Sequence, residues 1–127
     1  MIKHIPFMCS LAIAACLMTP TASALTGAQA KQCRALGASL QVRQVEAKTM
    51  GEARDGLAET VELAGEEWEA AEAMRNFGAD QAAEADARKT SYDQLRSDLM
   101  RKEMALQSAV GMLNGDVYDY NEVCAEK

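Results

Sequence analysis

The chain has 127 residues and a formal net charge of −6, with 49% hydrophobic and 25% charged residues. Beyond any targeting segment, a chain of this length holds one domain at most. Its acidic balance argues against nucleic acids and anionic membrane surfaces as partners.

The first 24 residues have the order of a cleavable secretory signal. Lys3 and His4 form a basic head, an apolar stretch runs from Ile5 to Met18, and Ala22-Ser23-Ala24 supplies small residues before a cleavage point. The apolar stretch is shorter than the ~20 residues that a membrane-spanning helix needs. We therefore expect removal of residues 1–24, a periplasmic or secreted protein, and no membrane span.

A lipid anchor is the alternative for the same segment. Ile13-Ala14-Ala15-Cys16 resembles a bacterial lipoprotein box, although Ile13 stands where Leu is usual. Acylation of Cys16 would tether the protein to a membrane surface. In either case the Ala-rich signal favours a bacterial cell envelope.

Residues 25–127 form a single predicted domain of the all-α class. All prolines, isoleucines and the one histidine precede residue 25, and loss of Lys3 takes the net charge from −6 to −7. The strongest helix breaker is therefore absent, while the remaining residues are mostly good helix formers.

Two long helices follow in chain order. Thr26 and Gln29 fit a capping box, so a helix is predicted over about 27–76. The turn is predicted at 77–80, with Gly78 in a left-handed conformation and Asp80 as the next N-cap. A second helix is predicted over about 81–113, and its apolar pattern continues in phase to 124.

The apolar residues of both segments follow helical spacing and define a candidate core. It comprises Leu57, Val61, Trp68, Tyr92, Leu95, Leu99, Leu106, Val110 and Leu113. The pattern is poorer before Leu57, where Arg43 and Arg54 occupy expected contact positions. A break near Gly51 would give a three-helix bundle, which we keep as the alternative to an antiparallel hairpin.

Cys33 and Cys124 are the cysteines left after signal removal, and an even number in an exported chain favours a disulfide. In a hairpin turning at Gly78, facing residues have numbers that add up to about 157. That register joins the two cysteines at the open end. It also pairs Val45 with Leu113. A bridge closing a loop of about 90 residues contributes ~4 kcal/mol in the chain-entropy model.

The residues that several classes of enzyme and cofactor site require are missing after residue 24. Without histidine after residue 24, the chain offers no Ser-His-Asp or Cys-His arrangement and no Glu-x-x-His di-iron motif. Phosphate-binding glycine motifs are also missing. We therefore expect no enzymatic activity, no cofactor and no metal.

Two groups of residues are candidates for binding other molecules. Glu59, Glu62, Glu66 and Glu69 share one helix face, which is a candidate acidic docking face or a solvated surface. Met50, Met100, Met104 and Met112 fit packing or an adaptable apolar surface. The sequence favours a non-enzymatic helical protein that docks onto an envelope partner or onto itself. A small periplasmic chaperone or apolar-ligand carrier is the alternative.

Overall fold

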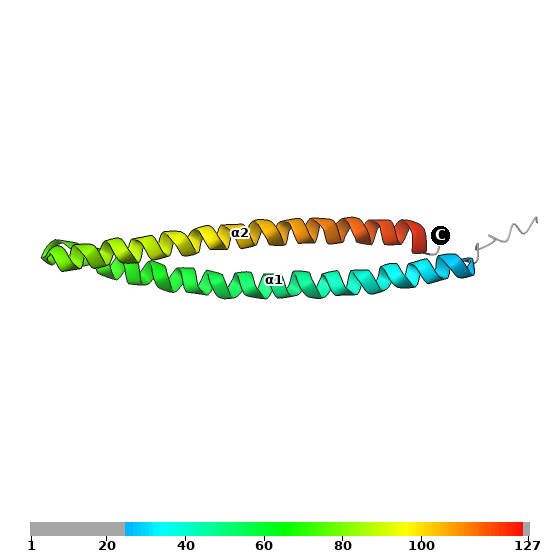
Figure 1. Ribbon diagram of the computed structural model, residues 1–127, viewed down its shortest axis with the longest axis horizontal. Helices are drawn as coiled ribbons and strands as arrows, with labels where there is room; N and C mark the ends of the chain where they lie inside the picture. The colour runs from blue at the N-terminus through cyan, green and yellow to red at the C-terminus, as the bar shows by residue number, and fades with distance from the viewer. Residues whose placement is uncertain (1–24, 126–127) are drawn as a thin grey trace, which may run out of the picture.

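A computed structural model describes residues 25–125, so the expected signal peptide and the Cys16 lipid site lie outside the described residues. The chain forms two long helices lying side by side, joined at one end (Figure 1). Helix α1 spans Gly27–Ala73, a short 3-10 helix η1 spans Arg75–Phe77, and α2 spans Ala79–Cys124. Within the described residues the fold is an antiparallel helical hairpin without strands.

Helix α1 begins at the predicted capping box. The backbone N–H of Gln29 donates to Thr26 Oγ1 over 3.3 Å, and the Thr26 N–H donates to Gln29 Oε1 over 2.9 Å. These bonds satisfy polar groups that the first helical turn leaves without an internal partner.

The first helix then continues for 47 residues without a break at Gly51. The three-helix bundle is therefore wrong, and the hairpin is confirmed. A single glycine costs a helix interior only about 1 kcal/mol relative to alanine. Packing against α2 and helix-forming neighbours outweigh that cost.

The turn differs in detail from the prediction. Helix α1 ends at Ala73 with Met74 as C-cap, and Gly78 is extended, with φ 163° and ψ 173°, rather than left-handed. Gly78 itself is the N-cap of α2, and Asp80 lies in the first helical turn. The carboxylate of Asp80 therefore complements the positive end of the helix dipole instead of capping the backbone.

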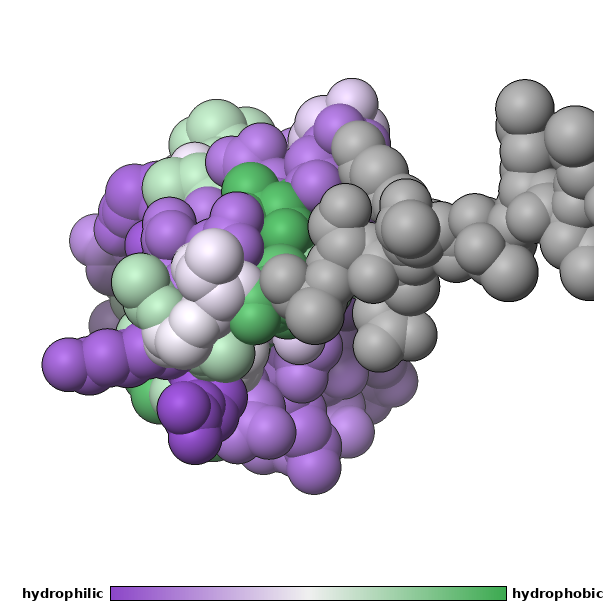
Figure 2. Space-filling view, turned by 90° about the vertical axis from the view of Figure 1, so that its right-hand side faces the viewer, coloured by the Kyte–Doolittle hydropathy of each residue, from purple (hydrophilic) through white to green (hydrophobic). Residues whose placement is uncertain are grey.

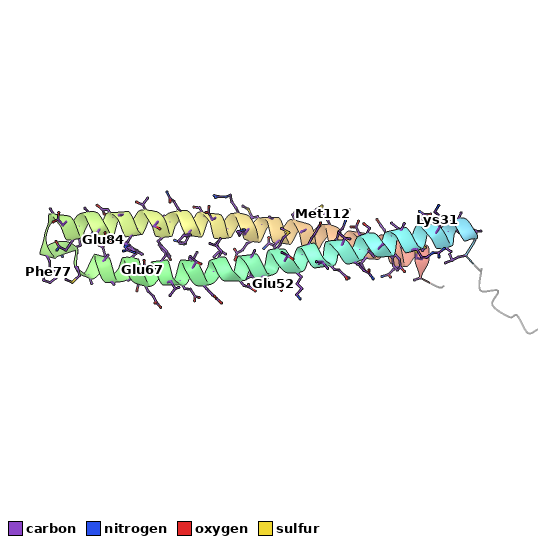
Figure 3. The ribbon with its side chains drawn as sticks, turned by 60° about the horizontal axis from the view of Figure 1, so that its bottom comes forward. Lys31, Glu52, Glu67, Phe77, Glu84 and Met112 are labelled. Atoms are coloured by element: carbon purple, nitrogen blue, oxygen red, sulfur yellow. A yellow bond between two sulfur atoms is a disulfide. The ribbon has the colours of Figure 1, made fainter. Side chains whose placement is uncertain are left out.

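The contact between the helices repeats every seven residues, the period of a coiled coil. On α1 it follows Cys33, Leu40, Ala47, Arg54, Val61 and Trp68, all buried or half-buried. On α2 it follows Ala85, Tyr92, Leu99, Leu106, Leu113 and Tyr120, again buried or half-buried. The helices run side by side in Figure 1 and cross in the turned view of Figure 3, as coiling around each other requires.

Small residues of α1 face large residues of α2 in the predicted register. A Cβ placed on Gly37 would lie 3.7 Å from the Tyr120 ring, and one on Gly65 would lie 3.2 Å from the Tyr92 ring. The same register sets Gly51 opposite Leu106. The two backbones can approach closely because glycine offers no side chain at these positions.

A disulfide between Cys33 and Cys124 closes the open end, with the two Cα atoms 5.6 Å apart. The predicted pairing is confirmed. Figure 2 looks onto this end and shows hydrophilic residues around most of the visible outline, with smaller hydrophobic patches between them. The bridge thus holds together the end of the rod farthest from the turn.

The core is thin, as expected for a pair of helices. Among the described residues only Cys33, Val61 and Ala85 are buried, while most candidate core residues are half-buried. Two expectations were wrong: Val110 is 40% exposed and Val45 is 65% exposed. Val45 lies well around α1 from the contact row, whereas Val110 stands at the edge of the contact row of α2.

Candidate interaction surfaces

The most elaborate contact between the helices surrounds Trp68. Its ring stacks on Tyr92 with centroids 5.4 Å apart and planes 20° apart, and the Lys89 ammonium lies 5.5 Å from its centroid. Stacked aromatic pairs add to the apolar burial, and a cation over the ring adds a further attraction. The indole Nε1 is buried without a hydrogen-bond partner. Trp68 therefore acts as a packing residue.

The two arginines at seam positions behave differently. Arg43 forms an ion pair with Asp116 across the hairpin. Arg54 reaches only its neighbour Asp55, over 3.1 Å, and its Nε is buried without a hydrogen-bond partner. A polar atom removed from water without a partner costs free energy, so we expect Arg54 to weaken the seam.

Ion pairs concentrate near the turn. Arg75 binds Glu72 and Asp86, and Arg88 binds Glu84 and Glu67. The hydrogen bond to Asp86 and then that to Glu72 raise the pKa of Arg75 above its usual value. A raised arginine pKa keeps the guanidinium charged, so the contribution of that group would be lost only above its ordinary range, at strongly alkaline pH. These links join α1 to α2 close to the turn.

The candidate acidic face lies on α1. Glu59, Glu62, Glu66 and Glu69 are all exposed, and none forms an ion pair within residues 25–125. The neighbouring Glu67 differs from these four because it forms an ion pair with Arg88 of α2. The four side chains therefore present unneutralised negative charge to the solvent.

Helix α1 carries a second row of residues with seven-residue repeats, which sequence reasoning missed. We call it the outer stripe. Its residues are Ala35, Ser39, Val42, Glu46, Thr49, Ala53, Gly56, Thr60, Leu63, Glu67, Ala70 and Met74. All twelve are exposed, and three are large apolar side chains: Val42 at 58%, Leu63 at 61% and Met74 at 49% exposed.

The outer stripe differs from an ordinary solvent-facing surface. Its only charged members are Glu46 and Glu67, and Glu67 is neutralised by Arg88. The outward face of a surface helix is normally rich in charged residues. A search for two parallel seven-residue repeats, in place of one apolar row, would have found it.

Helix α2 has its own uncharged region. From Met104 to Gly115 no residue is charged on any side of the helix, and Met100, Met104, Val110 and Met112 are exposed. In Figure 3 the Met112 side chain points away from α1. This α2 region, from Met104 to Gly115, therefore gathers exposed apolar side chains outside the seam.

The hairpin offers shallow open hollows. One, near the turn, is lined by residues such as Ala71 and Glu84, and another by residues such as Leu57 and Lys102. Among residues 25–125, no group of three or more His, Cys, Asp or Glu side chains is placed to hold a metal ion. Neither α1 nor α2 contains an apolar stretch long enough to cross a bilayer.

Comparison of the chain with models of protein families, with curated proteins and with solved structures found no match.

Proposed function

We propose that this chain is an exported, non-enzymatic interaction protein of the bacterial cell envelope, which docks through its helices onto a partner or onto a copy of itself. Export rests on the signal-like order of residues 1–24. Docking rests on the outer stripe of α1, where Val42 and Leu63 stand exposed among small and uncharged residues.

A hairpin of two helices is a thin rod with most of its surface in water. It buries one row of each helix and leaves the rest in water, where charged residues are the norm. The outer stripe departs from that norm, with two charged residues among twelve. Val42 and Leu63 are large apolar side chains of this row, and the small uncharged residues between them let a partner approach closely. The unpaired acidic face beside the stripe adds a charged edge that selects partners by their own charge.

The test is photo-crosslinking in the native cell. A photoreactive side chain replaces Leu63, and the matched control carries it at Ser97, which is exposed on α2 outside the outer stripe. A discrete adduct is expected at Leu63 and not at Ser97, and it is lost when Val42→Glu is added. Equal adducts at both positions, or none at either, would contradict docking through the stripe.

A second candidate, a small chaperone or apolar-ligand carrier, is favoured by the uncharged α2 region, in which Met104, Val110 and Met112 are exposed. Methionine surfaces adapt to varied apolar partners. This function predicts that the native protein binds a hydrophobic dye and suppresses aggregation of a model client. Met104→Glu with Met112→Glu would lower both effects, and absence of both in the unaltered protein would exclude it.

A further inference from the structure

We propose that α1 forms the interface of an antiparallel homodimer, in which the outer stripe of one copy packs along the outer stripe of a second copy. The inference rests on the proposed interaction function and names its partner. It also sets an orientation and a register, which can be tested separately from the existence of an interaction.

The spacing of the outer-stripe residues favours a helix as the segment that covers the stripe. The outer stripe occupies two positions of the same heptad frame as the seam, and it runs from Ala35 to the C-cap Met74 along most of α1. A rigid helix with the same period can follow it without losing contact. A second α1 has that period, and its outer stripe also needs covering.

Charge favours a second copy in the antiparallel orientation. Lys31 and Arg34 at the start of α1 are exposed and form no ion pair within residues 25–125, while the four glutamates of the acidic face lie in its second half. Antiparallel docking places the basic end of each copy at the end of the other copy's acidic half, where Glu69 is the nearest of these four glutamates to Arg34. Parallel docking would align the acidic faces and repel.

The side chains select a register in which facing residues have numbers adding up to about 105. Val42 of one copy then lies next to Leu63 of the other, and the small residues Thr49 and Gly56 meet at the centre. Small residues at the centre allow the two helices to approach closely.

The charged members of the stripe agree with this register. Glu46 faces Thr60 of the second copy, and Glu67 faces Ser39, so no glutamate of the stripe meets another. Ala35 faces Ala70 at each end. Displacement by one heptad, to a sum of about 112, would instead bring Glu46 against Glu67, two like charges opposite each other.

The first experiment is sedimentation equilibrium on the full chain, expressed with residues 1–24 so that the cell processes it, and purified oxidised. The test variant is Gly56→Arg and the control is Gly111→Arg. A Cβ at either glycine meets no atom within 4 Å in the hairpin, so both helices tolerate the change. Gly56 lies on the outer stripe, whereas Gly111 lies on α2 outside it.

We expect a dimer for the unaltered protein and for Gly111→Arg. For Gly56→Arg we expect the dissociation constant of the dimer to rise by about 100-fold or more, as for a residue at the centre of an interface. Circular dichroism should show equal helix content in both variants. A monomeric unaltered protein, or equal affinity of the two variants, would overturn the proposal.

The second experiment tests the register. A photoreactive side chain at Ala70, in a mixture of heavy and light isotope-labelled copies, should crosslink to the peptide containing Ala35 of the other copy. Within one hairpin these residues lie 35 positions apart on one helix, or ~50 Å, so the crosslink cannot form internally. An adduct between two Ala70 regions would show parallel packing and overturn the antiparallel dimer.

The outcomes separate the two proposals. If the chain is monomeric and the Leu63 photoprobe reaches a different envelope protein in the cell, self-docking is wrong and the interaction function stands. If the chain dimerises through Gly56 but Leu63 forms no adduct in the cell, self-association exists outside the cell only, and the proposed function fails.

Discussion

Gly65 lies directly against Tyr92: a Cβ at Gly65 would come within 3.2 Å of Tyr92 Cε2. The three seam glycines differ in this respect, because a Cβ at Gly37 would be 3.7 Å from Tyr120 and one at Gly51 would meet nothing within 4 Å. The helix alone gains up to about 1 kcal/mol from replacing glycine by alanine. The space available decides how much of that gain remains.

We therefore expect Gly51→Ala to stabilise the protein most, by roughly 0.5–1 kcal/mol, and Gly37→Ala by slightly less. Gly65→Ala should gain least, since the Tyr92 ring must shift. The measurement is urea unfolding followed by far-ultraviolet circular dichroism at one protein concentration. A larger gain from Gly65→Ala than from Gly51→Ala would contradict the packing described for the ring.

Removal of the disulfide should lower the stability of the whole hairpin. The bridge spans 91 positions of sequence, and in the chain-entropy model such a loop contributes ~4 kcal/mol. We expect Cys33→Ala with Cys124→Ala to lose a large part of that amount. Hydrogen exchange should accelerate most at the open end and least near the turn, where Arg75 and Arg88 join the helices. Uniform acceleration along both helices would contradict this.

Arg54 should be replaceable with a gain in stability. Its Nε is buried without a partner, and leucine at the same seam position would fill the space without a polar atom. We expect Arg54→Leu to stabilise by about 1 kcal/mol. Arg43→Leu is the matched control, because it removes an ion pair with Asp116 and should be neutral or destabilising. Loss of stability in Arg54→Leu, measured by denaturant unfolding, would show that Arg54 supports the seam.

Self-association should depend on the charge at the start of α1. Reversal by Lys31→Glu with Arg34→Glu places negative charge beside the acidic half of the second copy, so we expect a weaker dimer. Salt should weaken the unaltered dimer as well, since exposed charges are screened beyond ~8 Å at physiological ionic strength. Lys102→Glu on α2 is the control. An affinity that is insensitive to both salt and charge reversal would contradict the antiparallel orientation.

The fold was largely predictable because one relation governs it. Cys33 and Cys124, Gly65 and Tyr92, and Gly37 and Tyr120 lie at equal distances from the turn, and in the structure each pair meets. Helix propensity alone could not decide whether α1 breaks at Gly51. The continuous heptad of contact residues across that position decides it, because a break would remove the partner of the whole N-terminal part.

Three features were not predicted correctly from the sequence, and each has a local physical cause. Asp80 resembles an N-cap, but the extended Gly78 ends the turn two residues earlier and takes that position. Val110 follows the helical spacing of its neighbours, yet it stands at the edge of the row, where one partner helix cannot cover it. The outer stripe was missed because its large apolar residues are few. They are separated by alanine, serine and threonine, which resemble an ordinary polar surface when the sequence is searched for a single apolar row.

The position of both free helix ends, at the disulfide, determines how far the hairpin can extend from a point of attachment. Because α1 begins and α2 ends at the same end of the rod (Figure 1), any attachment through the N-terminal side, including acylation of Cys16, would hold the molecule by that end alone. The turn would then project by the length of α1, ~70 Å for 47 residues. Phe77, 74% exposed at the tip, would be the first apolar side chain that a distant surface meets.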